Sequence, residues 1–353
     1  MQTFLSVLLG IVLFGIIIFV HELGHFLTAR AFGVGILEFA LGMGPKLVSK
    51  KGKDGVVYSL RLIPIGGFVS MVGEDSEAPE GMEELSLCAK KPWQRFIIVS
   101  AGAVMNILMG FILMMGVVVS SPAIYNNKIE AFLVKDQNGV IVDSYKGLML
   151  GDEILKVGSK NIKVRSDLVY EAFFLADSPV DITVRRDGKR VVVENFTFPV
   201  LTQQEMVVGN PSFFYPGIVE KTPVNVIKEG MGQSVSMVNM IWKSLVSLIT
   251  GRFGVEAMSG PVGVVSEIKE TATMGFSSVV FLFVMISLNV GVFNLLPIPA
   301  LDGGRLFFIL VEMIRRKPIN PKYEGAIHFA GLVILMAFMV FVTFNDIMRI
   351  FTK

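Results

Sequence analysis

Four long apolar runs dominate the hydropathy pattern of this chain. They lie at residues 4–27, 96–120, 276–296 and 327–344, and each reaches the roughly 20 residues that a helix needs to cross a bilayer. The first run has no basic residues before it and is longer than the apolar region of a signal peptide, so we expect it to be retained. The pattern predicts a polytopic α-helical membrane protein with four transmembrane helices.

The polar segment after the first run predicts β structure. Residues 38–75 have the composition of short strands separated by turns, and residues 55–71 are rich in β-branched and aromatic side chains. Pro64, Gly66 and Gly67 interrupt this stretch, which favours a β-hairpin or a bent edge strand. We expect this hairpin to be associated with the membrane.

A small α+β domain is predicted between the second and third runs. Asp187–Gly188 favours a two-residue hairpin turn, and Ser166 is the expected N-cap of a short helix over residues 166–176. Apolar and polar residues alternate, as in strands, over residues 139–143, 153–158, 181–186 and 190–198.

The pattern divides the chain into four parts, namely residues 1–120, 121–205, 206–275 and 276–353. The third part is expected to be a linker with an amphipathic helix, because residues 231–249 place apolar side chains at helical spacing. Two interpretations of this helix remain open. It either lies in the plane of the membrane interface or packs on the surface of the α+β domain.

Composition agrees with a membrane protein and excludes several function classes. The chain has 353 residues, of which 52% are hydrophobic and only 18% charged, whereas about a quarter of residues are charged in soluble domains. The net charge of +2 gives no basic field for nucleic acid. Cys88 is the only cysteine, so an internal disulfide and a thiolate-rich metal site are both excluded.

Basic residues near the ends of the runs predict the orientation in the membrane. They concentrate in the loop between the first two runs and in the loop between the last two, which places both loops in the cytoplasm. Both termini and residues 121–275 would then lie on the outer side of the membrane. For a bacterial inner membrane, that compartment is the periplasm. The basic residues concerned are Arg30, Lys46, Lys50, Lys51, Lys53, Lys90, Lys91, Arg95, Arg305, Arg315, Arg316, Lys317 and Lys322.

The sequence His21-Glu22-Leu23-Gly24-His25 places ionisable groups inside the first apolar run, where insertion is costly unless they are paired or bind an ion. Residues i and i+4 share one face of a helix, so His21 and His25 can direct their ring nitrogens to one point. Glu22 would flank that point as a proton acceptor. The spacing predicts a zinc site near the cytoplasmic end of the span. Alternatively, these three polar side chains bind no metal and reach toward the membrane interface from the end of the helix.

A third protein ligand is needed for a catalytic zinc. The only other histidine is His328, a lone residue for which we expect a structural role. Asp302 is the better candidate, because it follows Pro299 at the end of the third apolar run. Irregular backbone at that depth must line a cavity or be buried in protein. The alternative is that Asp302 is a helix N-cap.

Together with residues 294–304, NLLPIPALDGG, the His-Glu-Leu-Gly-His motif resembles the site-2 protease family of intramembrane metalloproteases, and its regulator-of-sigma-E protease branch in particular. The resemblance covers nearly the whole chain. It implies that His21, His25 and Asp302 bind Zn2+ and that Glu22 is the catalytic base. It implies no small-molecule cofactor.

The resemblance also implies substrate-binding residues. Asn294 matches a position near the substrate backbone or the oxyanion, and Asn106 matches a polar position of the second span. For Asn106 an interhelical hydrogen bond is the simpler role. The edge of the β element would hold an unwound substrate as an added strand, although a purely structural hairpin is the alternative. The matching edge residues are Gly67, Phe68, Val69, Ser70 and Met71.

Residues 139–158 resemble a bacterial PDZ domain, and a single such domain is visible. The matching positions are Gly147, Leu148, Gly151, Asp152 and Ile154, whereas residues 144–146 form a shortened version of the usual loop. This domain would either capture a peptide or act as a filter that excludes bulky ectodomains from the active site.

The implied function is intramembrane proteolysis. The expected partners are membrane lipid and single-span membrane proteins, such as an anti-sigma factor or signal-peptide remnants. Two other function classes are a catalytically inactive PDZ scaffold and an ion or proton transporter. The complete ligand set argues against the scaffold, and the lack of a visible inverted repeat argues against the transporter.

Overall fold

The computed structural model of the protein describes residues 2–74, 79–134, 141–176, 178–203, 206–251 and 260–352. The chain forms two compact units. Residues 1–110 and 244–353 make up unit 1, and residues 111–243 make up unit 2.

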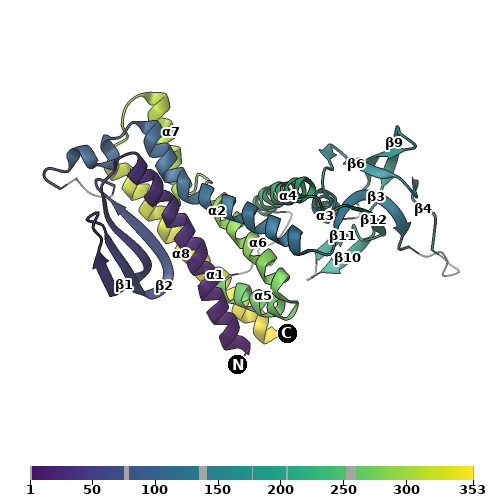
Figure 1. Cartoon of the computed structure of the whole chain (residues 1–353), viewed down its shortest axis with the longest axis horizontal. Helices are drawn as coiled ribbons and strands as arrows, with labels where there is room; N and C mark the ends of the chain where they lie inside the picture. Colours follow the sequence, from purple (N-terminus) through teal and green to yellow (C-terminus); the bar gives the residue numbers. More distant parts are fainter. Residues whose placement is uncertain are drawn as a thin grey trace. The chain divides into compact units, whose positions relative to one another are not determined.

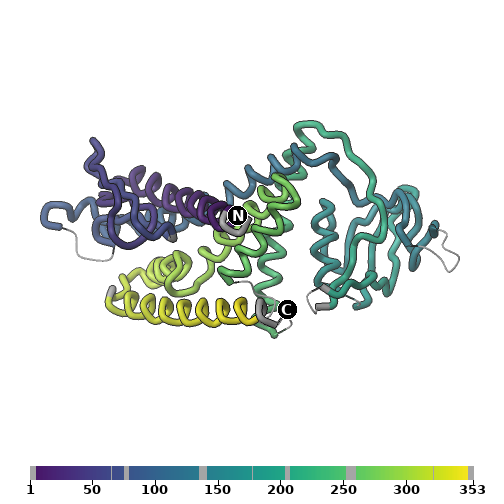
Figure 2. Tube along the Cα trace, turned by 90° about the horizontal axis from the view of Figure 1, so that it is seen from below, coloured from purple at the N-terminus to yellow at the C-terminus, as the bar shows by residue number. Residues whose placement is uncertain are grey.

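Four helices among the described residues are long and apolar enough to cross a membrane, as the apolar runs predicted. They are α1 (Gln2–Ala31), α2 (Pro92–Ser120), α6 (Phe276–Asn294) and α8 (Pro321–Thr352). Figure 2 shows α8 as one unbroken helix. Helix α1 continues through the histidine motif, so residues 21–25 keep regular helical spacing.

The β element of unit 1 is a bent ribbon of two long paired strands, β1 (Ile36–Lys51) and β2 (Val57–Met71), which lies beside α1 (Figure 1). The expected hairpin with short strand segments is present, because residues 38–41 pair with residues 67–70 on one side and with residues 57–60 on the other. Pro64, Gly66 and Gly67 lie where β2 bends between these two segments. Gly66 has a φ of +84°, and register shifts along the ladder let the strands bend without ending.

The core of unit 1 joins the ribbon to the helices. Phe26 of α1 and Phe39 of β1 meet edge to face with ring centroids 5.4 Å apart. Gly24 lies so close to α2 that a Cβ atom there would be 2.4 Å from the carbonyl oxygen of Ala101. Backbone contact between α1 and α2 therefore occurs within the histidine motif. The other buried side chains of this core are Ala29, Val34, Val56, Val69, Met71, Leu87 and Ile98.

Two short 3-10 turns, η1 (Glu83–Leu85) and η2 (Leu87–Ala89), precede α2. Helices α5 (Pro261–Thr273) and α7 (Asp302–Arg315) also belong to unit 1. Helix α5 packs on α1 and α8.

Unit 2 contains an antiparallel sheet with the strand order β12-β3-β6-β8-β9, and β7 pairs with β6. Strand β12 falls in the segment expected to be a linker, so the sheet extends past residue 205. The strands are β3 (Ile124–Phe132), β6 (Glu153–Val157), β7 (Lys160–Asn161), β8 (Val180–Arg186), β9 (Lys189–Phe196) and β12 (Phe214–Val219). Two small ribbons accompany it, β4 (Ser144–Tyr145) with β5 (Leu148–Met149), and β10 (Val200–Gln203) with β11 (Met206–Gly209).

Local signals in unit 2 were partly correct. Asp187 and Gly188 both have positive φ, at 50° and 79°, which confirms the predicted two-residue turn between β8 and β9. The prediction that Ser166 caps the following helix was wrong, because α3 (Arg165–Leu175) begins one residue earlier. The carboxylate of Asp167 instead accepts a hydrogen bond of 2.9 Å from the backbone N–H of Lys163.

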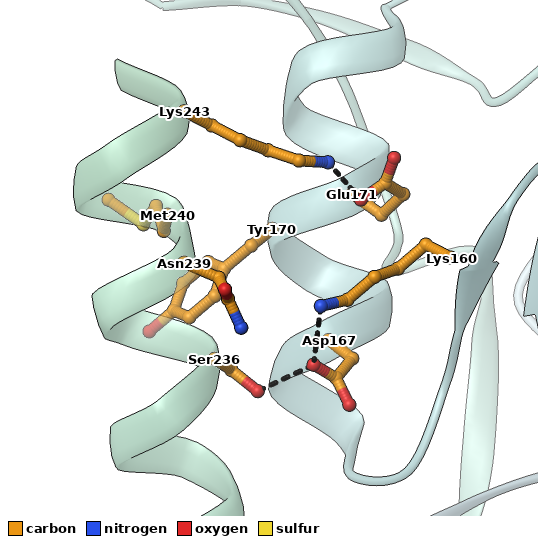
Figure 3. Close-up of a pocket in the computed structure, with 8 residues that line it drawn as sticks. All are labelled: Lys160, Asp167, Tyr170, Glu171, Ser236, Asn239, Met240 and Lys243. Atoms are coloured by element: carbon orange, nitrogen blue, oxygen red, sulfur yellow. Dashed lines mark hydrogen bonds and ion pairs between the residues drawn. The ribbon is translucent and has the colours of Figure 1, made fainter. Parts of the chain in front are cut away.

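In unit 2, residues 236–243 of helix α4 (Pro223–Ile249) pack against α3 (Figure 3). The hydroxyl of Ser236 donates a hydrogen bond of 2.7 Å to Asp167, and Lys243 pairs with Glu171. These contacts favour packing on the domain surface over a helix free to lie in the membrane interface. The outward stripe stays apolar and exposed, as at Val235 and Trp242.

The polar network around Glu38 generates a testable pH dependence of the ribbon. Its carboxylate accepts bonds from the Ser59 hydroxyl at 2.6 Å and from Arg61 at 2.8 Å, and it pairs with Lys46 at 2.9 Å. Burial works to raise the pKa of Glu38, but Ser59, Lys46 and Arg61 outweigh it and lower the pKa to about 2 from an ordinary value of 4.5.

We expect Glu38→Gln to lower the melting temperature of the purified protein at pH 6. A lowered pKa stabilises the folded state above the unfolded value, and this contribution disappears as pH falls from about 4.5 toward 2. The difference in melting temperature between the wild type and Glu38→Gln should therefore shrink over that window. A difference that stays constant between pH 6 and pH 3 would contradict the assignment.

Candidate metal centre

The last turns of α1 bring two imidazoles together. His21 and His25 are four residues apart on a continuous helix, and their Nε2 atoms lie 3.2 Å from each other. Their rings meet edge to face at an interplanar angle of 82°. The helix alone produces this convergence, as the spacing predicted.

Asp302 reaches the same point from the turn between α6 and α7. Its Oδ2 atom lies 3.0 Å from Nε2 of His21 and 3.4 Å from Nε2 of His25. Helix α7 begins at Asp302, and the N-cap position is Leu301, so the carboxylate does not cap the helix. The predicted grouping of His21, His25 and Asp302 is therefore present in the structure.

A tight turn holds the aspartate in place. At Gly303 a Cβ atom would lie 1.8 Å from the carbonyl oxygen of Leu296, which only glycine avoids. Ala300 has a φ of +77°, and its N–H donates a hydrogen bond of 3.1 Å to Nδ1 of His328. This bond gives His328, on α8, the structural role expected for it.

The three side chains fit a metal ion. Ligands of a tetrahedral zinc at about 2.0–2.2 Å lie roughly 3.3 Å from one another, and the three separations here run from 3.0 to 3.4 Å. Apart from these two imidazole nitrogens, the buried Oδ2 atom of Asp302 has no hydrogen-bond partner in the described part of the chain. Together these residues form a possible metal-binding group within the described part of the chain.

A backbone contact fixes how one of the histidines presents its lone pair. Nδ1 of His25 lies 2.9 Å from the carbonyl oxygen of Ile98 on α2. Because a carbonyl oxygen only accepts, Nδ1 must carry the proton. Nε2 of His25 is then left with a lone pair that faces the metal position.

Glu22 lies beside the start of the predicted substrate edge. A Cβ atom at Gly67 would lie 3.1 Å from Cγ of Glu22 and 2.9 Å from Ile18. Of the other edge residues, Val69 and Met71 are buried in the core of unit 1, whereas Phe68 and Ser70 are half-buried. Gly67 therefore allows the strand to pass close to the glutamate.

Sequence reasoning missed two features of this centre. Gly102 of α2 faces both histidines, and a Cβ atom there would lie 2.3 Å from Nε2 of His25 and 2.8 Å from Nε2 of His21. Arg305 of α7 pairs with Glu74, whose carboxylate also accepts a bond of 3.3 Å from the N–H of Met71. No local pattern marks either feature, because each depends on contacts between distant segments.

The remaining candidate, Asn294, is the last residue of α6 and begins the turn that leads to Asp302. Asn106 is fully buried on α2, and its Nδ2 atom lies 3.4 Å from Nδ1 of His21. The amide therefore makes the interhelical contact expected from the sequence, and its partner on α1 is a predicted metal ligand.

Comparison with known proteins agrees with this centre. Residues 9–338 match the model of peptidase family M50. The chain is 35% identical to a Clostridium perfringens protein that is named as a zinc metalloprotease. The match covers 97% of this chain and 98% of that protein. It is 29% identical to the regulator of sigma-W protease RasP of Bacillus subtilis, over 98% and 99% of the two chains. The chain therefore belongs to peptidase family M50, the site-2 protease family, and is an integral membrane zinc metallopeptidase of bacteria.

Proposed function

We propose that this protein cleaves the transmembrane segments of single-span membrane proteins. The observation that carries the proposal is the convergence of His21, His25 and Asp302 at the end of an apolar helix, with Glu22 beside them. The name of the Bacillus subtilis relative suggests an anti-sigma factor as one substrate class, and signal-peptide remnants are another.

In the proposed reaction His21, His25 and Asp302 hold the ion. Zinc at this position would polarise a water molecule and the scissile carbonyl group. Glu22 accepts a proton from the attacking water and delivers it to the leaving amine. Asn294, at the start of the Asp302 turn, is proposed to donate a hydrogen bond to the substrate backbone or to the developing oxyanion.

The edge of β2 is proposed to hold the substrate extended. Peptide bonds in a helix are shielded, so the substrate must unwind before cleavage. Residues 67–71 pair with β1 on one side, and the other side has no strand partner within the described residues. A peptide added to that side would pass Gly67, which is next to Glu22.

The remaining proposals concern topology and unit 2. The distribution of basic residues supports a metal centre near the cytoplasmic side, with both termini and unit 2 in the periplasm. The sheet and α3 of unit 2 support a PDZ-like domain. Its Leu148 is fully buried, and Asp152 is buried and paired with Arg186 at 2.7 Å, so two of the PDZ-matching positions have structural roles. We propose that this domain is a size filter.

Changing Glu22→Gln should abolish cleavage of a single-span substrate but leave zinc bound, because the amide keeps the shape of the side chain and cannot accept the proton. Cleavage is measured with purified enzyme and substrate in detergent, and zinc content by elemental analysis. Normal cleavage by this variant would overturn the role of Glu22. Ion flux into vesicles without any cleavage by the wild type would favour the transporter. The absence of both ion flux and cleavage would favour the scaffold.

The substrate edge can be tested by disulfide cross-linking in a Cys88→Ser background that also carries Glu22→Gln. Ser70→Cys should cross-link to a cysteine placed near the cleavage site of a bound substrate. The matched control is Ser49→Cys, an exposed serine on the segment of β1 that pairs with Ser59. Equal cross-linking at both positions would argue against substrate binding along residues 67–71.

Gly102→Ala should reduce zinc binding without unfolding the protein, because the added methyl group occupies the space in front of both Nε2 atoms. We expect at least a tenfold loss of zinc affinity. Gly116→Ala, on the same helix with no atom within 4 Å of its Cβ position, should retain zinc. Full zinc content in Gly102→Ala would contradict the proposed metal position.

A further inference from the structure

A buried amide contacts the predicted zinc ligand His21. Asn106 has no exposed surface, and its Nδ2 atom lies 3.4 Å from Nδ1 of His21. Its Oδ1 atom is buried with no hydrogen-bond partner. Leaving a buried acceptor unpaired is costly, so this side chain requires an explanation.

The backbone of α2 holds Asn106 in this position. The hydroxyl of Ser287 on α6 donates a hydrogen bond of 2.7 Å to the carbonyl oxygen of Asn106. That bond joins α2 to α6 and uses none of the side-chain amide. The amide therefore does not provide this interhelical bond and remains directed at His21.

Each of the two histidines needs its own acceptor to keep a proton on Nδ1. A histidine that binds zinc through Nε2 must carry its proton on Nδ1, and a nearby acceptor commonly fixes this state. The carbonyl oxygen of Ile98 is that acceptor for His25. For His21 the corresponding position is occupied by the amide of Asn106.

We propose that Asn106 is the positioning residue that holds His21 in its metal-binding tautomer. Rotation of the amide by 180° exchanges its oxygen and nitrogen, which occupy nearly equal volumes. Oδ1 then accepts a hydrogen bond from Nδ1–H of His21, so the acceptor is paired, and Nδ2 takes the position that Oδ1 held. Nε2 of His21 presents its lone pair toward Asp302 and His25. This inference rests on the proposed ligand set.

The test compares zinc affinity of full-length variants in detergent, measured by competition with a chelator of known affinity. Asn106→Leu removes the acceptor at nearly constant size and should weaken zinc binding 10- to 100-fold. Asn106→Asp keeps an acceptor and loses the donor, so it should stay within threefold of the wild type. Ser287→Ala, which removes only the bond to the backbone of Asn106, should also bind zinc like the wild type.

Two results would overturn the proposal, namely wild-type zinc affinity in Asn106→Leu, or an equal loss in Asn106→Leu and Asn106→Asp. In the second case Asn106 would act as a donor or as a packing residue. If a variant does not fold, nitrogen-15 spectra of histidines in the zinc-loaded wild type decide instead. They should show a proton on Nδ1 of His21 that exchanges slowly with water, and its absence would count against the proposal.

The ligand set has its own test in the same assay. If the wild type does not bind zinc, or if His21→Ala binds zinc as the wild type does, the proposed ligands are wrong. If the wild type binds zinc and His21→Ala does not, but Asn106→Leu is unaffected, only the role of Asn106 is wrong.

Discussion

The close approach of α1 and α2 is the constraint on which the metal centre depends. Gly24 and Gly102 lie at this contact, and neither has space for a side chain. The approach gives His25 the carbonyl group of Ile98 and brings the amide of Asn106 to His21. A wider separation would leave both histidines without partners on Nδ1, and rotation about their side-chain bonds would then separate the proposed ligands.

Much of the architecture could be predicted because the signals are local. A span of about 20 apolar residues and an i,i+4 pair of histidines each fix a geometry within one helix. The turn at Asp187–Gly188 was equally local. The bend of the ribbon near Gly66 was also local, but the double pairing of residues 38–41 with residues 57–60 and 67–70 depends on contacts that no local pattern shows. Proline and glycine in a strand do not show whether its pairing with a distant segment continues beyond them.

The parts of the centre that escaped prediction are those that depend on contacts across the sequence. Gly102 is one of several glycines in apolar helices, and only its distance to the imidazoles distinguishes it from Gly116. Glu74 and Arg305 are separated by 231 positions. Asp302 could be proposed because proline and glycine surround a carboxylate at the end of a span, whereas its exact orientation depends on helices that the local pattern does not place.

The turn that carries Asp302 shows how such contacts maintain a strained backbone. A non-glycine residue at positive φ, such as Ala300, costs on the order of 1–3 kcal/mol, so surrounding contacts must stabilise it. His328 accepts the N–H of that residue, and the backbone of α8 at Gly331 packs directly on Pro299. Helix α8 contributes no ligand among the described residues of the metal group. Its contribution to the centre is to hold the turn, because relaxation of Ala300 toward negative φ would move the carboxylate away from the histidines.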